Sequence, residues 1–495
     1  MKSISLTFLI GLLVGLSGCT SETGKQDDMI ETTSKPAFAL EKHRPQFHFS
    51  PQEKWMNDPN GMVFYDGEYH LFYQYYPKNT VWGPMHWGHT VSTDLVHWEH
   101  LPIALAPDEL GYIFSGSAVI DWNNTTGFQT GEHPPMIAIF THHLAEGEKA
   151  GRDDYQVQSI AYSLDKGRSW TKYEGNPVIP NPGLKDFRDP KVFWHDASNA
   201  WVMIFAAGNR VRLYRSADLK SWELASEFGA DQGSHAGVWE CPDLFPLQDE
   251  DGKTHWVMIV SLGSGAPNGG SGTMYFIGDF DGHQFTNANP ADKVMWIDYG
   301  ADNYAGVSWA DIPAEDGRRI FLGWMSNWAY ALLVPTENWR SAMTVARSLH
   351  LEKVDEDLIV VSRPVKEMQK IYGPETSFSQ IGVGDKWALE QTIPAAGARL
   401  RAKLSASDEN TRWWIRLQNQ KGQYVDIGAD GSTASFFVDR QHAGDHAFSD
   451  KFANKVHTAP YAATASSQVE LLIDVSSVEI FIDGGRLVMT ELFFP

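Results

Sequence analysis

The sequence predicts an all-β protein in which a β-propeller is followed by a β-sandwich. Most of the chain consists of short runs of β-branched and aromatic residues, such as 201–205, separated by Gly, Pro, Asn or Asp. A Ser-x-Asp turn followed by an aromatic residue recurs several times before residue 290. The residue pattern changes after about Leu351, which indicates a second domain. Long helical periodicity is missing, which excludes a coiled coil.

Composition narrows the class of protein. The chain has 495 residues and is 42% hydrophobic, which is enough for two or three domains. Its formal net charge is -22, from 40 Lys and Arg against 62 Asp and Glu, and this excess of acid argues against nucleic acid as a partner. Aromatic residues reach 13%, with 19 Trp, an amount that suits stacking on flat apolar faces such as sugar rings.

The first 19 residues are predicted to be a targeting segment rather than part of the fold. A charged start, Met1-Lys2, precedes an apolar run at 4–16 that is too short to span a bilayer. The run ends in Leu16-Ser17-Gly18-Cys19, which resembles the bacterial lipobox, where the cysteine is lipidated and becomes the mature N-terminus. Residues 20–42 are polar and are expected to form a flexible tether. We therefore expect an exported protein with a lipid anchor at Cys19, facing either the periplasm or the cell surface.

The repeat predicts a propeller over residues 43–365. Its copies lie at 92–98, 163–170 and 216–222, with a degenerate fourth at 279–285. The closing aromatic residues, Trp98, Trp170, Trp222 and Phe285, are 72, 52 and 63 residues apart, the length of a four-stranded blade with its loops. Because the innermost strands of a propeller converge on one axis, acids that are far apart in sequence can meet in one pocket.

A second β domain is predicted at 376–495. The stretch from Arg363-Pro364 to Ser379 is polar and reads as the boundary. Beyond it, Val478–Ile482 alternates as a strand does and precedes the turn Asp483-Gly484-Gly485. About 115 residues of such sequence suffice for a β-sandwich.

Cysteine and histidine usage indicates no metal site. Apart from Cys19, the chain has one cysteine, Cys241, so an intrachain disulfide and a cysteine metal cluster are excluded. Four histidines lie close in sequence, but their spacing matches no standard metal site, and we interpret them as structural: His86, His89, His97 and His100.

Three acids stand out from the charged background. Asp58 lies in Trp-Met-Asn-Asp-Pro-Asn-Gly at 55–61, Asp189 follows Arg188 in 187–190, and Glu240 lies in Trp-Glu-Cys-Pro-Asp at 239–243. We expect Arg188 to keep Asp189 ionised and apolar neighbours to raise the pKa of Glu240 toward that of a proton donor. An ionised carboxylate and a protonated carboxyl are two groups that glycoside hydrolysis needs. Taken singly, an acid in such a motif is more often structural, in a turn or a surface ion pair, than catalytic.

The three motifs together resemble the signatures of glycoside hydrolase family 32, the invertases, inulinases and levanases. The resemblance covers nearly everything from His43 onward and extends to further segments at 72–75, 82–89, 114–117, 302–305 and 323–328. It implies a five-bladed propeller with a C-terminal sandwich and a chemistry that needs no metal or organic cofactor. It also implies one more strand beyond Pro495.

The resemblance assigns roles to the three acids. It implies that Asp58 attacks the anomeric C2 of a fructosyl unit, and that Glu240 protonates the leaving oxygen and later activates water, so that the β configuration is retained. Asp189 is implied to hold fructose hydroxyls and to stabilise the transition state. Ten further positions are implied to line the substrate pocket: Asn57, Gln74, Trp82, Phe114, Ser115, Arg188, Cys241, Asp302, Tyr304 and Trp324.

Several functions remain open at this stage. The motifs at 85–89, 240–245 and 339–344 look more like those of exo-acting levanases and inulinases, so we favour release of fructose from the ends of β-fructans, with sucrose also cleaved. The alternatives are an invertase acting mainly on sucrose and short oligosaccharides, and an endo-acting fructanase. From another class, a non-catalytic fructan-binding lipoprotein would lack at least one of the three acids, and none is missing. The linkage preference and the oligomeric state stay open.

Overall fold

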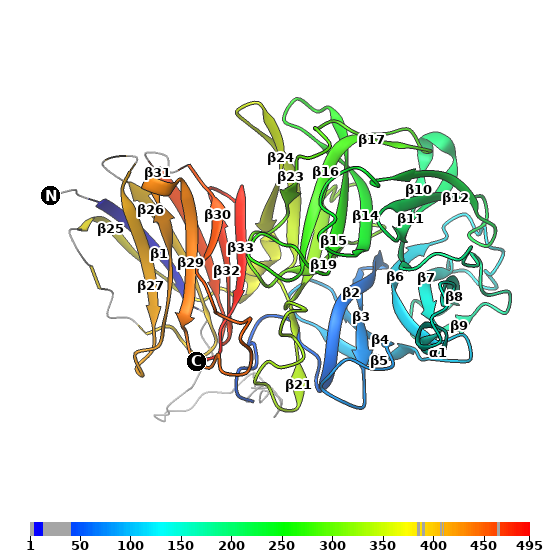
Figure 1. The fold of residues 1–495 in the computed structure, drawn as a ribbon, viewed down its shortest axis with the longest axis horizontal. Helices are drawn as coiled ribbons and strands as arrows, with labels where there is room; N and C mark the ends of the chain where they lie inside the picture. Colours follow the sequence, from blue (N-terminus) through cyan, green and yellow to red (C-terminus); the bar gives the residue numbers. More distant parts are fainter. Residues whose placement is uncertain are drawn as a thin grey trace, which may run out of the picture.

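The computed structural model describes residues 4–12, 41–383, 387–388, 392–405, 408, 410–462 and 466–495. Strands dominate this part of the chain, which contains a single α-helix, α1 (Ala145–Lys149), and short 3-10 turns at Asp196–Ser198, Lys366–Ile371 and Gly431–Thr433. The prediction of an all-β protein is therefore confirmed. Figure 1 shows two parts side by side, the sheets of residues 54–364 and those built mainly from the C-terminal strands.

Residues 54–364 form five separate sheets. The first contains β2 (Lys54–Tyr65), β3 (Glu68–Tyr76), β4 (His86–Ser92), β5 (Glu99–Leu105) and β21 (Trp339–Arg340). The second contains β6 (Tyr112–Ile120), β7 (Met136–His143), β8 (Gln156–Ser163) and β9 (Thr171–Lys172). The third contains β10 (Phe187–His195), β11 (Ala200–Ala207), β12 (Val211–Ser216) and β13 (Glu223–Phe228). The fourth contains β14 (Trp239–Gln248), β15 (Thr254–Leu262), β16 (Gly272–Phe280), β17 (Phe285–Asn287) and β18 (Met295–Trp296). The fifth contains β19 (Tyr304–Ser308), β20 (Arg319–Met325), β22 (Ala342–Met343), β23 (Arg347–Val354) and β24 (Asp357–Pro364).

The first strands of these sheets form a closed ring. β2 contacts β6, β6 contacts β10, β10 contacts β14, β14 contacts β19, and β19 returns to β2. Each sheet continues outward from its first strand through antiparallel neighbours, with the two-residue β21 added in parallel on the other side of β2, so the five first strands are the innermost long ones. Residues from 58 to 304 are thereby brought around one axis.

The sequence repeat coincides with one structural position. Each Ser-x-Asp turn joins the third strand of a sheet to the fourth, as between β8 and β9, where Ser163 Oγ donates to Asp165 Oδ1 at 2.7 Å. The same bond recurs after β12, from Ser216 to Asp218 at 3.1 Å. In the degenerate copy Asp281 accepts from the backbone of His283 instead, at 2.8 Å. The interpretation of the repeat as a turn within a repeated sheet is therefore confirmed.

The C-terminal part is two sheets that share one apolar core. One sheet has the order β25 (Glu375–Val383), β1 (Ile4–Leu12), β26 (Ala398–Ser405), β31 (Ser466–Ile473), β32 (Ser477–Ile482) and β33 (Leu487–Leu492). The other contains β27 (Arg412–Gln418), β28 (Tyr424–Asp430), β29 (Ser435–His442) and β30 (His457–Pro460). Ile427 and Phe436 of the second sheet belong to the same buried cluster as Leu471 and Ile480 of the first, as in a β-sandwich.

The N-terminal predictions meet the structure only in part. Residues 4–12, predicted as the apolar run of a signal peptide, form β1 between β25 and β26. Residues 13–40, which include Cys19 and nearly all of the expected tether, lie outside the described residues. Lipidation and tethering therefore stay predictions. Within the described ranges, no helix has the length and apolar character that a membrane crossing requires.

Buried charges join the two parts. Arg347, on β23, pairs with Asp298 and with Glu479 of β32, and all three side chains are at most 2% exposed. The backbone of 299–302 also runs against β33, where Tyr299 N–H donates to the Val488 carbonyl at 2.8 Å. Gly300 permits this approach, because a Cβ there would lie 2.2 Å from the backbone nitrogen of Thr490. The two parts thus share one continuous interior.

Candidate active site

The five innermost strands share an irregularity at the same end. The pairing register shifts between Met56 and Pro59 in β2, and at the corresponding start of the other four strands, Ile113–Gly116, Arg188–Lys191, Glu240–Asp243 and Tyr304–Val307. β-Bulges of this kind re-aim side chains and are common beside active sites. All three candidate acids lie in or beside these shifts, so their side chains turn toward the shared axis rather than alternating across a sheet.

Asp58 sits in the bulge of β2, and three neighbours face its carboxylate. Asn57 Nδ2 donates to Oδ1 at 3.0 Å, and Ser115 Oγ, from β6, donates to Oδ2 at 2.8 Å. Cys241 Sγ lies 3.6 Å from Oδ2. Burial raises the pKa of Asp58, and the charge of Glu240 raises it further, while the bonds from Asn57 and Ser115 act in the opposite direction. These donors hold the oxygens in one orientation and favour the anion.

Asp189, on β10, is 6% exposed and is fixed mainly by backbone groups. The Cys241 N–H donates to Asp189 Oδ2 at 3.0 Å. The Asp189 N–H donates to Thr141 Oγ1 of β7, also at 3.0 Å. Asp189 and Cys241 both have left-handed backbones, with φ of 66° and 45°, a conformation that non-glycine residues adopt mostly where the surroundings enforce it.

Arg188 lowers the pKa of Asp189, as expected, but burial outweighs this effect. Burial raises the pKa of Asp189 to about 7, and although Arg188 lowers it, the charges of Glu240 and Asp58 add to the rise. The reason is geometric, because the guanidinium binds Asp186 and Glu240 and leaves only its Nε within 3.9 Å of Asp189. Asp189 therefore lies buried among negative charges whose effect one guanidinium does not outweigh.

Glu240, at the start of β14, has polar rather than apolar surroundings, which corrects the environment expected for it. Its side chain is 22% exposed, Arg188 donates to Oε1 at 2.9 Å, and the Tyr304 hydroxyl donates to Oε2. Its sequence neighbours Trp239 and Cys241 are buried, but the partners of its carboxyl oxygens are the polar groups of Arg188 and Tyr304. Glu240 and Asp58 are both partly exposed, so two carboxyls of the cluster are open to a ligand and to water.

Aromatic and amide side chains surround the three carboxyls. Trp324 is fully buried, and its ring contacts those of Trp55 and Tyr304 at 6.1 and 6.2 Å. Its indole N–H has no hydrogen-bond partner among the residues that the structure describes. Gln74 is 2% exposed, with an unpartnered Nε2, and lies on β3 between the residues that pair with Met56 and Pro59 of β2. Buried donors without partners are expensive unless a ligand or water completes them.

Trp82 and Phe114 form a more open aromatic pair. Their ring centroids lie 6.0 Å apart at 79°, and Trp82 is 38% exposed. Phe114 also stacks on His143, with centroids 4.2 Å apart, and directly precedes Ser115, which contacts Asp58. A partly exposed aromatic face beside hydrogen-bonding groups is typical of sites for small polar ligands.

A buried ion pair lies further along the same strands. Lys191 Nζ is 3.2 Å from Asp243 Oδ2 and donates to the backbone carbonyl of Ser308. Asp243 Oδ2 also accepts from Ser308 N–H at 2.8 Å and from its hydroxyl at 2.7 Å. Lys191 and Asp243 end the irregular segments of β10 and β14, so one cluster connects these strands with β19 just beyond the three candidate acids.

One predicted pocket residue lies elsewhere. Both carboxylate oxygens of Asp302 are engaged at the boundary with the sandwich, where Tyr330 donates to Oδ1, and Arg440 and the Leu492 N–H donate to Oδ2. The prediction that Asp302 binds substrate is therefore corrected to a structural role. The structure places Tyr304, two residues later, in the cluster through its bond to Glu240.

Three residues of the site were missed from the sequence. Thr141 fixes the backbone of Asp189, Asp186 holds Arg188, and Trp55 Nε1 donates to Asn57 Oδ1 at 2.7 Å. Trp55 is the first residue of the motif at 55–61 and Asp186 directly precedes the motif at 187–190, so both could have been assigned, whereas Thr141 comes from a strand without any motif. Among the described residues, no group of His, Cys, Asp and Glu side chains has the arrangement of a metal site.

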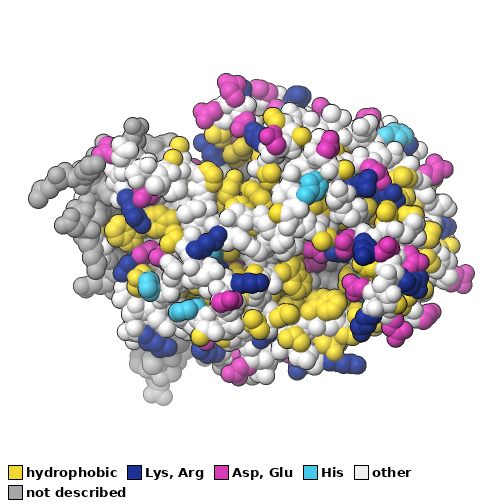
Figure 2. Space-filling view, in the orientation of Figure 1, with side chains coloured by type: hydrophobic (Ala, Val, Ile, Leu, Met, Phe, Trp, Pro, Cys, Tyr) yellow, Lys and Arg dark blue, Asp and Glu magenta, His cyan; other side chains and the backbone are white. Residues whose placement is uncertain are grey.

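Figure 2 shows how charge is spread over one face of the molecule. Asp and Glu side chains are scattered over it and are interspersed with Lys and Arg rather than separated into one acidic and one basic region. The excess of acid in the sequence thus does not produce a single-sign surface on this face.

Comparison with known proteins places this geometry in a family. The model "Glycosyl hydrolases family 32 N-terminal domain" matches residues 48–364, and "Glycosyl hydrolases family 32 C terminal" matches residues 367–495. A levanase of Bacillus subtilis (strain 168) is 51% identical over 462 residues, which cover 92% of this chain and 67% of that protein.

Solved structures agree with the sequence match. The exo-inulinase of Aspergillus awamori superposes with a TM-score of 0.82 and 35% identity, over 92% of this chain and 94% of that one. The fructofuranosidase of Schwanniomyces occidentalis, solved with fructose, gives 0.78 and 32% identity, over 93% and 94%. This protein is a glycoside hydrolase and belongs to glycoside hydrolase family 32.

Proposed function

We propose that the protein is a retaining exo-β-fructosidase, which releases terminal fructose from β-fructans such as levan and inulin and also cleaves sucrose. The observation that carries this proposal is the convergence of Asp58, Asp189 and Glu240 from three different strands, with Arg188 contacting the last two and Cys241 contacting the first two. The five sheets around them are proposed to be the blades of a five-bladed propeller. The relatives named levanase and exo-inulinase support the choice of substrate class.

The first step is attack by Asp58. Its carboxylate forms a bond to the anomeric C2 of the fructosyl unit while the C2–O bond to the rest of the substrate breaks, and Glu240 gives its proton to the leaving oxygen. Asn57 and Ser115 hold the Asp58 oxygens in place during the attack. The product of this step is a fructosyl ester on Asp58.

The second step is hydrolysis of that ester. Glu240, now ionised, takes a proton from a water that attacks C2, and Asp58 leaves as a carboxylate, so two inversions give net retention. The partial exposure of Glu240 provides a path for this water. Tyr304 and Arg188 bind different oxygens of Glu240 and keep it oriented through both steps.

Asp189 is proposed to bind fructose hydroxyls and stabilise positive charge at C2 in the transition state. Hydrogen bonds with Cys241 and Thr141 hold Asp189 in position. The unpartnered donors of Gln74 and Trp324 are proposed to bind further hydroxyls of the same sugar. Trp82 and Phe114 would pack against the apolar face of the ring.

A time course of products tests the proposal. Levan, inulin and sucrose are incubated with wild type, Asp58→Asn and Glu240→Gln, and with Asp311→Asn as a matched control. Asp311 is a carboxyl that accepts from the backbone of Ile120, at the other end of β6 from Ser115. We expect fructose alone from the earliest times, loss of at least about 10³-fold in both site variants, and little change in the control.

The same experiment separates the alternatives. Early oligosaccharides from the polymers would show an endo-acting fructanase, and turnover of sucrose without turnover of polymers would show an invertase. Absence of turnover by folded wild type would leave a fructan-binding protein. Methanol added to the sucrose reaction should give methyl β-fructofuranoside, because a retaining enzyme transfers fructose to the acceptor with the same configuration; the α product would contradict retention.

Export and lipid anchoring at Cys19 are part of the proposal. They are supported by the apolar run and the lipobox-like Leu16–Cys19. Labelled palmitate fed to expressing bacteria should be incorporated into wild type and not into Cys19→Ala, whereas equal labelling would refute the anchor.

A further inference from the structure

A groove of about 460 Å³ lies between the third and fourth sheets, away from the catalytic cluster. Its walls come from the end of β13 and from β17, the outermost regions of the sheets whose innermost strands carry Asp189 and Glu240. The walls are tied together, since Ser226 Oγ donates to the His283 carbonyl at 2.6 Å and Gly233 N–H to the Ala291 carbonyl at 2.8 Å. The groove is therefore preformed, and its volume falls in the usual range for ligand sites of about 300–1,000 Å³.

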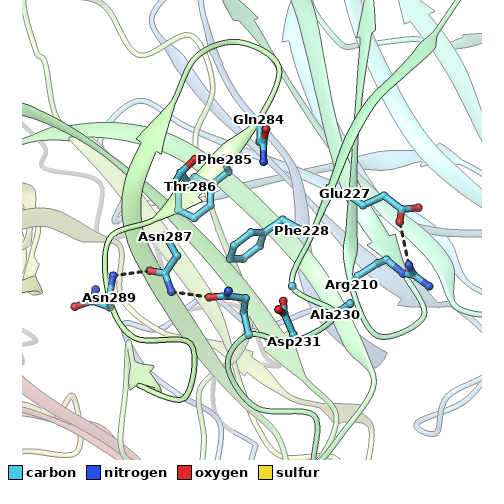
Figure 3. Close-up of a pocket in the computed structure, with 12 residues that line it drawn as sticks. Arg210, Glu227, Phe228, Ala230, Asp231, Gln284, Phe285, Thr286, Asn287 and Asn289 are labelled. Carbon is cyan, nitrogen blue, oxygen red and sulfur yellow. Dashed lines mark hydrogen bonds and ion pairs between the residues drawn. The ribbon is translucent and has the colours of Figure 1, made fainter.

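An aromatic ring lies in the middle of this groove. Figure 3 shows Phe228 between the Arg210–Glu227 pair on one side and Thr286 and Asn287 on the other. The ring is half-buried, and Phe285 and Phe276 contact it edge-on at 5.0 and 5.2 Å. These contacts fix the ring, so its open part is an apolar surface against which the C–H face of a sugar can pack without further ordering.

Hydrogen-bonding groups line the groove beside the ring. Asn287 Oδ1 accepts from Asn289 N–H at 3.1 Å, and Asn287 Nδ2 donates to Gln232 Oε1 at 3.0 Å (Figure 3). This chain orients the Gln232 amide, whose Nε2 has no partner within the described residues. The Asp231 carboxylate is exposed, and it also has no hydrogen-bond partner among the described residues. The groove thus offers a fixed amide donor and a carboxylate acceptor to a ligand with hydroxyl groups.

Charge in the groove selects against anions. Arg210 is the only cation that lines it, and Arg210 Nη1 is already paired with Glu227 at 2.9 Å. Arg212 binds the other oxygen of the same carboxylate. Asp231 has no counter-ion among the described residues, so the lining offers no free cation to a phosphorylated or polyanionic ligand. The chemistry that fits is a neutral, hydroxyl-rich chain with apolar ring faces.

We propose that this groove is a second carbohydrate site, which binds an internal segment of the β-fructan whose free end enters the Asp58 pocket or that of a neighbouring enzyme molecule. The inference rests on the proposed function for the identity of the polymer. Binding at two places raises the residence of the enzyme on a polymer without changing its chemistry. Sucrose is too small to use the groove while it occupies the catalytic pocket.

Native gel electrophoresis through gels that contain levan or inulin tests the groove, with every chain carrying Glu240→Gln so that the polymer survives. Two changes alter the groove without touching Phe228: Thr286→Arg, which fills it from an exposed strand position, and the pair Asp231→Ala with Gln232→Ala. Thr254→Arg is the matched control, because Thr254 is exposed on β15 of the same sheet but does not line the groove. Active chains with the same changes are assayed on sucrose.

We expect both groove variants to lose at least about five-fold in affinity for one polymer or both, with the control like wild type and sucrose turnover unchanged. Equal retardation of all variants in both polymers would overturn the second site, as would no retardation of any chain. Loss of sucrose turnover in the groove variants would place the effect in the catalytic pocket and overturn it as well. Failure of wild type to hydrolyse any fructoside would instead refute the proposed function, so the two failures are distinguishable.

Discussion

At the scale of single residues, the pKa of Asp189 shows the cost in folding free energy of bringing three carboxyls together. Its pKa is raised to about 7 by burial and by the charges of Glu240 and Asp58, against the effect of Arg188. The unfolded chain would hold this proton only below pH about 4. Between pH about 4 and 7 the folded state therefore binds more protons than the unfolded state, and stability falls as the pH rises through that window.

Replacement of Asp189 by Asn should remove this destabilisation. The amide keeps an acceptor for the Cys241 N–H and carries no charge. We expect Asp189→Asn to unfold at higher temperature than wild type at pH 8, by on the order of 1–4 kcal/mol in free energy, and the gain to vanish near pH 4. Activity should fall at least about 10²-fold. Thermal denaturation at pH 4, 6 and 8 checks this, and an equal or lower stability at pH 8 would contradict it.

Cys241 lies between two of the acids and should be chemically inert. Burial raises the pKa of its thiol well above the usual range, and the charges of Asp189 and Asp58 raise it further. Because the thiolate is the reactive form, iodoacetamide at pH 7.5 should leave Cys241 unmodified in the folded protein and alkylate it in urea. Mass spectrometry of the peptide that contains Cys241 measures both, and rapid alkylation of the native protein would show that the thiol is accessible and ionised.

At the scale of elements, the site depends on irregular starts to regular strands. Five innermost strands shift register at the same end, and these shifts turn Asp58, Asp189 and Glu240 toward one axis. Lys191, Asp243 and Ser308 connect three of the strands just after their irregular segments. We infer that this cluster keeps the separation between Asp189 and Glu240 constant.

Breaking the Lys191–Asp243 pair should therefore affect both stability and chemistry. Lys191→Met and Asp243→Asn each leave one buried charge unpaired, which costs about 3–5 kcal/mol, and the double variant should lose less than the sum. We expect kcat to fall more than KM rises, because the displaced acids act on the transition state. Arg399→Met is the control, since it breaks the Arg399–Glu470 pair within the sandwich and should leave kcat unchanged. Equal kcat in all variants would refute positioning by this pair.

These elements also show how far the sequence leads. The alternation of residues and the spaced Ser-x-Asp turns predict sheets and their repeat, and three short motifs predict the acids. β-Bulges leave no comparable pattern in the sequence. The left-handed φ of Asp189 and Cys241 within these bulges is enforced by neighbouring strands and not by the residue type. For the same reason Thr141 was missed, and the environment expected for Glu240 from Trp239 and Cys241 was wrong. Asp302 was misassigned because its partners, Tyr330, Arg440 and Leu492, lie up to 190 residues away in sequence.

At the scale of the whole molecule, buried charges from both parts converge at their boundary. Arg440 of β29 contacts Asp302 and Glu491, while Arg347 contacts Glu479. Separation of the two parts would expose these groups to water but would also break several hydrogen bonds made in low dielectric, where such bonds are strong. We therefore infer that the parts unfold together rather than one after the other.

His48 gives this boundary a pH dependence. It precedes the first sheet, and its Nδ1 and Nε2 lie 2.8 Å from Asp474 and Glu479 of the sandwich, with all three side chains fully buried. Burial alone would lower the pKa of His48, but the two carboxylates raise it to about 9. A raised pKa means that the charged imidazolium contributes stability fully below pH about 6.5, and that this contribution is lost as the pH rises through about 9.

Replacement of His48 by Gln should reveal that contribution. A Gln side chain keeps hydrogen-bonding groups but no charge, so His48→Gln should be less stable than wild type by about 3 kcal/mol at pH 6 and nearly equal to it at pH 10. Urea denaturation at pH 6, 8 and 10 measures the difference. His446→Gln, an exposed position in the sandwich, should match wild type throughout. A difference between His48→Gln and wild type that stays constant with pH would show that the contacts of His48 are made by a neutral ring, and a second transition at high pH would show that the two parts separate once its charge is lost.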